Sequence, residues 1–170
     1  LAFFDLDKTL ITLDSSYVFA KKYYNPYLLL FSLLRKLRFI SKTSFYLRLT
    51  KHCDGVLNNK ELDSFTNELT NYKNNKIFEL ALKQKSNSSL VVVISSSPHI
   101  YVSHLSRKFG FIGFGSYFDE NNQFNHLEGG KKFDKIKEKY PPDKYVYRLG
   151  VSDNFSDTSF SDKFESWIKV

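Results

Sequence analysis

The 170-residue chain contains little cysteine, glycine or proline and has no long apolar run. Its single cysteine, Cys53, excludes an internal disulfide, and we expect a reducing, cytoplasmic compartment. The most apolar stretch, YLLLFSLL at residues 27–34, is shorter than the roughly 20 residues that a membrane-spanning helix needs. The hydrophobic content of 42% and the charged content of 25% are those of one folded domain, or of a domain with an inserted lobe.

The formal net charge of +7 favours anionic partners such as phosphates or acidic lipid surfaces, although lysines also keep an aromatic-rich protein in solution. No nucleic-acid-binding motif is present and the lysines form no stripe, so we expect no nucleic acid as a partner. Residues 27–40 combine apolar residues with Arg35, Lys36 and Arg38, which indicates an amphipathic helix with a basic flank. Such a helix lies on an anionic membrane surface or packs inside a helical lobe, and packing is the commoner outcome.

The order of apolar patterns predicts an α/β protein. Residues 1–4 have the pattern of a short buried strand, and from residue 15 to residue 82 apolar residues recur at helical spacings of three and four. Residues 91–94 form a β-branched run, which is typical of a strand buried on both faces of a parallel sheet. Pro98 suits the first position of a following helix, and Gly110 suits its end.

The C-terminal part continues this alternation. We expect short strands around an Asn121-Asn122 turn, a helix over residues 131–140, a strand that ends in Asp153 and a last strand over residues 164–170. The sequence therefore predicts a layered α/β core with a parallel sheet and an inserted helical lobe. The expected boundaries are residues 1–14 and 83–170 for the core and residues 15–82 for the insertion.

Four polar clusters follow strand-like runs or open a helix. They are Asp5/Asp7/Thr9, Ser95/Ser96/Ser97, Lys131/Lys132 and Asp153/Asp157. Ligands of open parallel sheets bind beyond the carboxyl ends of the strands, so parallel strands would bring these clusters to one edge. Carboxylates there suit Mg²⁺, and a hydroxyl and an ammonium group suit an anion. Together they predict a site for phosphoryl transfer, where positioning and charge neutralisation do most of the work.

Each cluster also has an ordinary structural interpretation when taken alone. A pair such as Asp5 and Asp7 is most often a solvated strand end, a serine run before proline is most often a helix cap, and paired lysines are usually surface charge. The four histidines lack the spacing of metal ligands, and Cys53 is better explained by packing than by catalysis. The order of the clusters along the chain is what favours a site over these interpretations.

This ordered set resembles the haloacid dehalogenase-like superfamily, in particular its phosphoserine-phosphatase-like branch, subfamily IB. The matching motifs are FFDLDKTL, VVVISSSP, GGKKFDKI and GVSDNFSD, which extend from Phe3 to Asp157. The resemblance implies a Rossmann-like core with a small helical cap of the C1 type after the first strand. It also implies Mg²⁺-dependent hydrolysis of a phosphomonoester through an aspartyl-phosphate.

The resemblance implies a role for each matching residue. Asp5 resembles the nucleophile, and Asp7 resembles the general acid that later acts as base. Asp5, Asp7 (through its backbone carbonyl) and Asp153 resemble the metal ligands. Thr9, Ser95 and Ser96 resemble the residues around the substrate phosphate, with Thr9 supporting the loop. Lys132, preferred over Lys131 for its spacing to Ile136, resembles the motif lysine, and Asp157 resembles the residue that holds it. Ser152 and Lys8 depart from the family pattern, since both replace a common glycine.

The resemblance leaves the substrate open, because the cap selects it. The apolar and basic cap segment and the form of GVSDNFSD are similar to phosphatidylglycerophosphatase C-like members, which implies a lipid phosphate and a peripheral contact with an anionic membrane. A small soluble phosphomonoester is the competing expectation. An inactive protein that binds a phosphorylated ligand or partner, and a phosphotransferase or mutase, are further alternatives.

Overall fold

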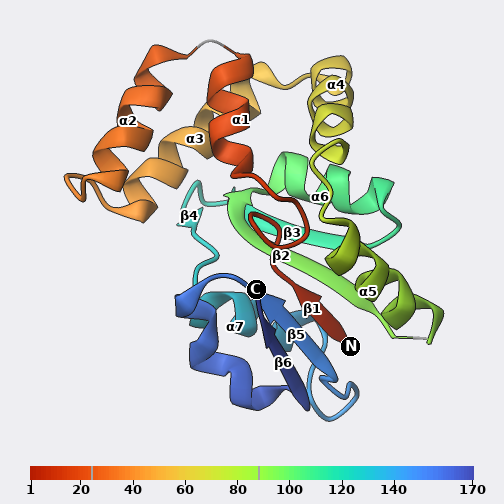
Figure 1. The fold of residues 1–170 in the computed structure, drawn as a ribbon. Helices are drawn as coiled ribbons and strands as arrows, with labels where there is room; N and C mark the ends of the chain where they lie inside the picture. The colour runs from red at the N-terminus through yellow and green to blue at the C-terminus, as the bar shows by residue number, and fades with distance from the viewer. Residues whose placement is uncertain (24, 88) are drawn as a thin grey trace.

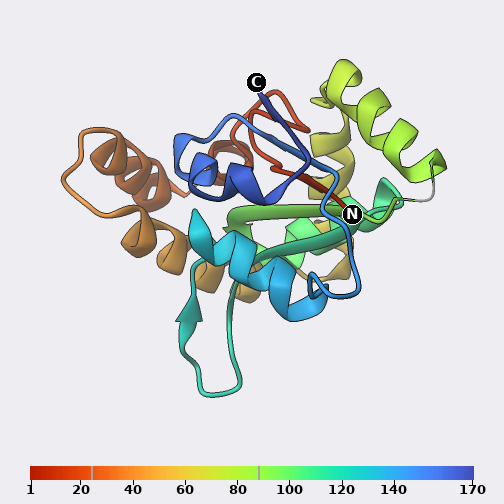
Figure 2. The same cartoon turned by 90° about the horizontal axis from the view of Figure 1, so that it is seen from below.

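The computed structural model describes residues 1–23, 25–87 and 89–170 and has a six-stranded sheet with the strand order β4-β3-β2-β1-β5-β6 (Figure 1). The parallel strands are β1 (Ala2–Phe4), β2 (Val91–Pro98), β3 (Ile112–Phe118), β5 (Leu149–Ser152) and β6 (Ser166–Lys169). The short strand β4 (Phe124–Asn125) runs antiparallel to β3, and the hairpin that they form projects from the sheet in Figure 2. This architecture confirms the predicted α/β fold with a parallel sheet.

The central strand β1 is buried on both faces because its side chains alternate between two apolar clusters. Ala2 and Phe4 belong to the cluster beneath helices α5 (Asn75–Ser86) and α6 (His99–Lys108). Phe3 belongs to the opposite cluster, beside helix α7 (Gly130–Lys139) and the 3₁₀ helix η1 (Phe155–Lys163). Its ring lies 5.7 Å from that of Phe160. The two layers of helices fix the direction of β1 and therefore the place where Asp5 leaves the sheet.

Four helices follow β1 before the chain returns to the sheet. They are α1 (Ser15–Lys22), α2 (Pro26–Lys36), α3 (Lys42–Val56) and α4 (Asn59–Thr70). Each begins after a side chain that accepts a backbone N–H of its first turn, namely Asp14, Asn25, Ser41 and Asn58. Pro26 at the first position of α2 has the backbone angle that a helix start needs. In the part of the chain that the structure describes, no helix has both the length and the apolarity to cross a bilayer.

The chain returns to the sheet through α5, which contacts β1 and β2. The return is fixed by a hydrogen bond of 2.9 Å from Asn74 N–H to the Leu10 carbonyl and by a bridge between Ile11 and Lys73. The predicted helical insertion over residues 15–82 therefore includes most of a helix that covers the sheet. Helices α1 to α4 precede it. The division into a core of residues 1–14 and 83–170 and an insertion of residues 15–82 is a proposal.

The segment after residue 94 differs from the prediction at one point. Pro98 was expected to be the first residue of a helix, but β2 continues through Pro98 and α6 starts at His99. The strand persists because Pro98 still pairs with Ser116 of β3 after a shift of register, and the Ser116 hydroxyl donates to the Ser96 carbonyl at 2.7 Å. The serines 95–97 consequently lie on an irregular strand end rather than in a turn.

Candidate active site

Asp5 follows β1 directly and lies in the interior of the protein. Its Oδ1 accepts the Leu6 N–H at 2.8 Å and lies 3.0 Å from Lys132 Nζ, and its Oδ2 accepts the Ser152 hydroxyl at 3.3 Å. Burial raises the pKa of the Asp5 carboxyl to about 7, against the opposing charge of Lys132. A buried carboxylate with a raised pKa and a cation in contact has the properties of a functional-site residue, and it is not a solvated strand end.

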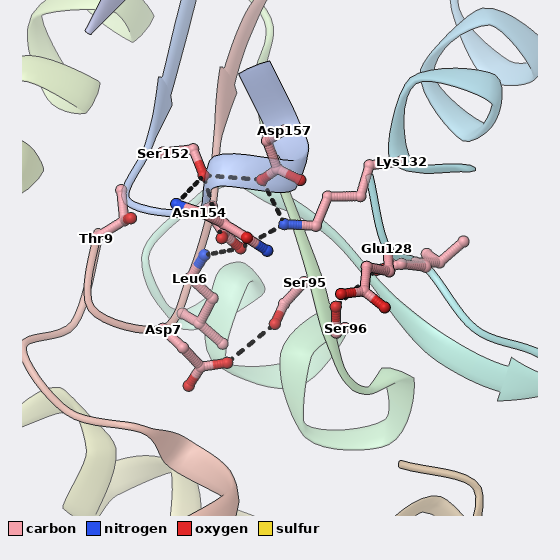
Figure 3. Close-up of polar contacts among 12 residues, drawn as sticks. Leu6, Asp7, Thr9, Ser95, Ser96, Glu128, Lys132, Ser152, Asn154 and Asp157 are labelled. Atoms are coloured by element: carbon pink, nitrogen blue, oxygen red, sulfur yellow. Dashed lines mark hydrogen bonds and ion pairs between the residues drawn. The ribbon is translucent and has the colours of Figure 1, made fainter. Parts of the chain in front are cut away.

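Lys132 is the cation at the centre of this cluster (Figure 3). It lies in the first turn of α7, has only 1% of its surface exposed, and places Nζ 2.7 Å from Asp157 and 3.0 Å from Asp5. Burial alone would lower the pKa of Lys132, but the two carboxylates outweigh that effect and raise it. Lys131 is exposed on the same helix. The structure therefore brings Lys132, and not Lys131, to the predicted nucleophile.

Asp7 has a different set of partners, all of them neutral donors. Its Oδ1 accepts the backbone N–H of Ser15 at 2.6 Å, and its Oδ2 accepts the hydroxyls of Ser97 at 2.7 Å and Ser95 at 3.0 Å. Burial, and then the nearby charge of Asp14, raises the pKa of the Asp7 carboxyl. A raised pKa favours the protonated form, which is the form that a general acid needs.

The two aspartates of the last motif have separate places. Asp153 is half buried, its N–H donates to the Thr9 hydroxyl at 3.0 Å, and burial raises the pKa of its carboxyl. Asp157 is fully buried, and its Oδ2 accepts both Lys132 and the Ser152 hydroxyl, the latter at 2.8 Å. Among the described residues, Oδ1 of Asp157 has no hydrogen-bond partner. Asp153 thus faces the pocket while Asp157 holds the lysine from behind.

A pocket of about 270 Å³ lies in front of these residues. The core contributes Asp5, Asp7, Ser95, Ser96 and Asp153 to its lining. The inserted helices contribute Arg35, Lys42 and Tyr46. Carboxylates of the core and cations of the insertion therefore share one cavity, so both parts of the chain would contact a ligand.

Two predicted phosphate-binding residues are placed less directly. Thr9 is fully buried and outside the pocket lining, where it contacts the backbone of Asp153. Ser96 lines the pocket, but its hydroxyl donates to the Leu127 carbonyl at 2.9 Å. Ser95 lines the pocket, and its hydroxyl donates to Asp7 at 3.0 Å and accepts the Ser97 N–H at 3.1 Å. Of the three residues, only Ser95 combines a place in the pocket lining with a hydroxyl that contacts Asp7, so it matches the predicted phosphate-binding role best.

Three serines at the site had no individual role predicted, although Ser97 belongs to the predicted cluster Ser95/Ser96/Ser97. Ser15 and Ser97 donate to Asp7, and their hydroxyls lie 3.2 Å from each other. Ser152 donates to Asp5 and Asp157. For Ser152 a signal existed, because it departs from the glycine that is common at that position of the motif. The position of Ser15 depends on how the helical insertion folds over the core, which no motif reveals.

The donor set of this pocket fits Mg²⁺. Asp5, Asp7 and Asp153 offer oxygen atoms only, and burial raises the pKa of all three carboxyls, a penalty that a divalent cation would offset. In the described residues, no three His, Cys, Asp or Glu side chains form a ready metal cage. Mg²⁺ commonly uses one or two protein carboxylates and completes its shell with water and phosphate oxygens.

The sequence profile of the haloacid dehalogenase-like hydrolases matches residues 2–151 of the chain. No curated protein sequence matches this chain significantly. A protein of unknown function from Bordetella pertussis Tohama I has a similar structure, with 13% identity and a TM-score of 0.74 over 95% of this chain and 85% of that one. A phosphoserine phosphohydrolase-like protein from Francisella tularensis subsp. tularensis SCHU S4 has 16% identity and a TM-score of 0.65 over 99% and 85%.

A phosphoserine phosphatase solved as an analogue of its phospho-aspartyl intermediate has 15% identity and a TM-score of 0.66, over 99% of this chain and 84% of that one. At these identities the solved structures establish a common fold. The family profile, which covers most of the chain, establishes the family and confirms the resemblance to it; the first three motifs lie within the matched residues. The protein belongs to the haloacid dehalogenase-like hydrolases and has the fold of their phosphoserine-phosphatase-like members.

Proposed function

We propose that the protein is a Mg²⁺-dependent phosphatase that hydrolyses a phosphomonoester through an aspartyl-phosphate at Asp5. The observation that carries this proposal is the difference between two neighbouring carboxyls. Asp5 contacts the Lys132 ammonium at 3.0 Å, whereas Asp7 contacts only neutral donors. The Lys132 charge favours the ionised form of Asp5 and opposes the effect of its burial. At Asp7 no such cation is in contact, and burial and the charge of Asp14 favour the protonated form, so the two environments suit two different roles.

In the first step, a carboxylate oxygen of Asp5 forms a bond to phosphorus while the bond between phosphorus and the ester oxygen breaks. The electron pair of that bond leaves with the alkoxide, and Asp7 supplies it with a proton. The Ser95 hydroxyl donates to the phosphoryl oxygens. Lys132 keeps the Asp5 carboxylate oriented by its contact with Oδ1, and Asp157 and Ser152 hold Lys132 and Asp5 in place.

In the second step, Asp7, now ionised, takes a proton from a water molecule that attacks phosphorus. The bond between the Asp5 oxygen and phosphorus breaks, which releases inorganic phosphate and restores the carboxylate. The hydrogen bonds from Ser15 and Ser97 hold Asp7 in one orientation for both proton transfers. Asp5, the backbone carbonyl of Asp7 and Asp153 would hold Mg²⁺, which when bound neutralises charge on the phosphoryl group.

The substrate is proposed as a phosphomonoester of either a lipid or a small soluble molecule. Arg35 and Lys42 lie in the pocket, so groups of the substrate beyond the phosphate meet cations of the insertion. Both cations also have carboxylate partners, since Arg35 lies 3.3 Å from Asp14 and Lys42 lies 2.5 Å from Glu128. The substrate would compete with these partners for the two cations.

Hydrolysis of p-nitrophenyl phosphate with and without Mg²⁺ tests the proposal. We expect turnover that requires the metal and is abolished by Asp5→Asn, with Asp134→Asn on the exposed side of α7 as the matched control. Turnover that survives in Asp5→Asn, in protein with an unchanged unfolding transition, would contradict the assignment of the nucleophile.

A further inference from the structure

Helix α2 turns an apolar face toward solvent. An α-helix turns by about 100° per residue, so Tyr27, Leu30, Leu33 and Leu37 fall within one third of its circumference. These side chains are 74%, 51%, 52% and 56% exposed. Phe39, in the loop that follows, is 75% exposed. Single exposed apolar residues are ordinary, whereas a continuous apolar helix face marks an interaction surface.

The opposite side of α2 faces the protein and mixes apolar and polar residues. Leu28 and Ser32 are both 4% exposed, and Arg35 reaches inward to Asp14. Leu28 belongs to the apolar core and Phe31 packs against it, so α2 carries apolar residues on both its inward and its outward side. Figure 1 shows α2 at the outer edge of the helical layer, with α1 and α3 between it and the sheet. No described residue covers the apolar face, as the exposures show.

The positive charge of the chain is concentrated in the segment that contains this face. Residues 15–53 contain eight basic residues and no acidic one, so the rest of the chain, with seventeen basic and eighteen acidic residues, is nearly neutral. Lys36 and Arg38 are exposed beside the apolar face and have no ion-pair partner among the described residues. Apolar side chains flanked by cations match the cross-section of an anionic bilayer, where apolar groups enter the interface and basic groups contact the headgroups.

The apolar face is continuous with the candidate active site. A groove lined by residues 35, 36 and 38–42 lies at the end of α2, and two of its residues, Arg35 and Lys42, also line the pocket that contains Asp5. A phosphate at Asp5 would therefore connect through these two cations to the exposed end of α2. A protein on a membrane with α2 in the interface would have the mouth of its pocket close to the headgroups.

We propose that the face formed by Tyr27, Leu30, Leu33, Leu37 and Phe39, with Lys36 and Arg38, docks on an anionic lipid bilayer and gives the site access to phosphomonoesters of membrane lipids. The substrate part of this inference rests on the proposed phosphatase function, whereas the docking part does not. The charge pattern favours a bilayer over a protein partner, because a second copy of the chain would bring the same cations together. An anionic surface would instead neutralise them.

Sedimentation with vesicles tests the docking without any turnover. We expect the protein to bind vesicles of phosphatidylglycerol and phosphatidylcholine far more tightly than vesicles of phosphatidylcholine alone, and to be released by salt. Leu30→Ser with Leu33→Ser should weaken binding by about tenfold or more, because two apolar groups no longer enter the interface. Lys36→Glu with Arg38→Glu should weaken it by a similar factor and reduce its salt dependence.

Matched controls on other surfaces should bind like the unaltered protein. They are Leu82→Ser with Val146→Ser, whose side chains are 42% and 57% exposed, and Lys76→Glu with Lys144→Glu. The unfolding midpoint of each variant shows that it is folded. Absence of vesicle binding, equal binding to uncharged vesicles, or equal loss in the controls would overturn the docking. A concentration-dependent dimer that the leucine variant dissociates would overturn it too, in favour of a second copy.

The substrate part has its own readout. If the protein hydrolyses p-nitrophenyl phosphate, addition of phosphatidic acid in the same anionic vesicles should release phosphate, and the leucine variant should lose this release more than it loses turnover of the soluble ester. Equal loss on both substrates would overturn the lipid assignment. Vesicle binding by a protein without any phosphatase turnover would leave the docking supported and the proposed function contradicted.

Discussion

Ser152 donates its hydroxyl to Asp157 Oδ2 at 2.8 Å, the same oxygen that accepts Lys132 Nζ at 2.7 Å. The serine also reaches Asp5 at 3.3 Å, so one hydroxyl links the predicted nucleophile to the carboxylate that holds its lysine. The hydroxyl itself accepts the Asn154 N–H at 3.0 Å, which ties the middle of the final motif to the end of β5. A residue that departs from the usual glycine of its motif thus joins the charged groups of the site.

Replacement of Ser152 by alanine should reduce both stability and turnover. The buried carboxylate of Asp157 loses a donor, and we expect a loss of about 1–3 kcal/mol in the free energy of unfolding, measured in denaturant. Because Ser152 positions Asp5 and does not line the pocket, kcat should fall several-fold while KM changes little. Ser159→Ala, an exposed serine of η1, is the control. A change in KM with unaltered kcat would argue against a positioning role.

Lys132→Met should abolish turnover, whereas Lys131→Met should not. Removal of the Lys132 ammonium leaves Asp5 and Asp157 buried without their cation, which we expect to destabilise the fold by roughly 3–5 kcal/mol. The exposed Lys131 has no such contact, and its replacement should leave the free energy of unfolding within about 0.5 kcal/mol of the original. Equal effects of the two substitutions on turnover would show that α7 does not present Lys132 alone to the site.

Added Mg²⁺ should raise the unfolding midpoint. A cation that binds only the folded state stabilises it by about 2.7 kcal/mol at a concentration of one hundred dissociation constants. Asp153→Asn should remove most of this increase, while Asp162→Asn, an exposed carboxyl of η1, should preserve it. An increase of the same size in Asp153→Asn would mean that the cation binds elsewhere.

The Cys53 thiol should be unreactive toward thiol reagents in the folded protein. It is fully buried in α3, and burial raises its pKa well above the ordinary value of 9.0. Reaction with Ellman's reagent should therefore require denaturant. The pKa of the Cys53 thiol is higher in the folded protein than in the unfolded chain, so the thiol contributes its full stability below pH 9. This contribution is lost as the pH rises above 9 and the thiol of the unfolded chain ionises. Cys53→Ala should reduce that alkaline loss, and rapid labelling of native protein would contradict the burial.

The sequence predicts the centre of the sheet well, because the strands β1, β2 and β5 are buried. The β-branched run at residues 91–94 and the apolar residues before Asp5 permit few other structures, and their place in the sheet confirms the parallel core. The motif order likewise brings Asp5, Asp7, Lys132 and Asp153 to one end of that sheet. These features follow from local pattern and from the rule that parallel strands end at a common edge.

Contacts that depend on tertiary packing could not be predicted from the sequence. The approach of Ser15 to Asp7 requires the fold of the helical insertion, and the continuation of β2 through Pro98 depends on pairing with Ser116. The apolar residues of α2 were expected to pack more often than to face solvent, because an apolar stripe does not state which partner will cover it. Leu30 and Leu33 are exposed in the structure. The helical spacing of apolar residues would be the same if they were buried, so it could not predict their exposure.

Covalent phosphorylation of Asp5 tests the central claim most directly. In Asp7→Asn the activated leaving group of a radiolabelled aryl phosphate departs without a proton, but the water that completes the cycle has lost its base, so the phosphorylated enzyme should accumulate. Acid quenching and peptide mapping should then find the label on Asp5, and Asp5→Asn should abolish it. Release of phosphate by the unaltered enzyme with no label on Asp5, or a label that persists in Asp5→Asn, would contradict the account.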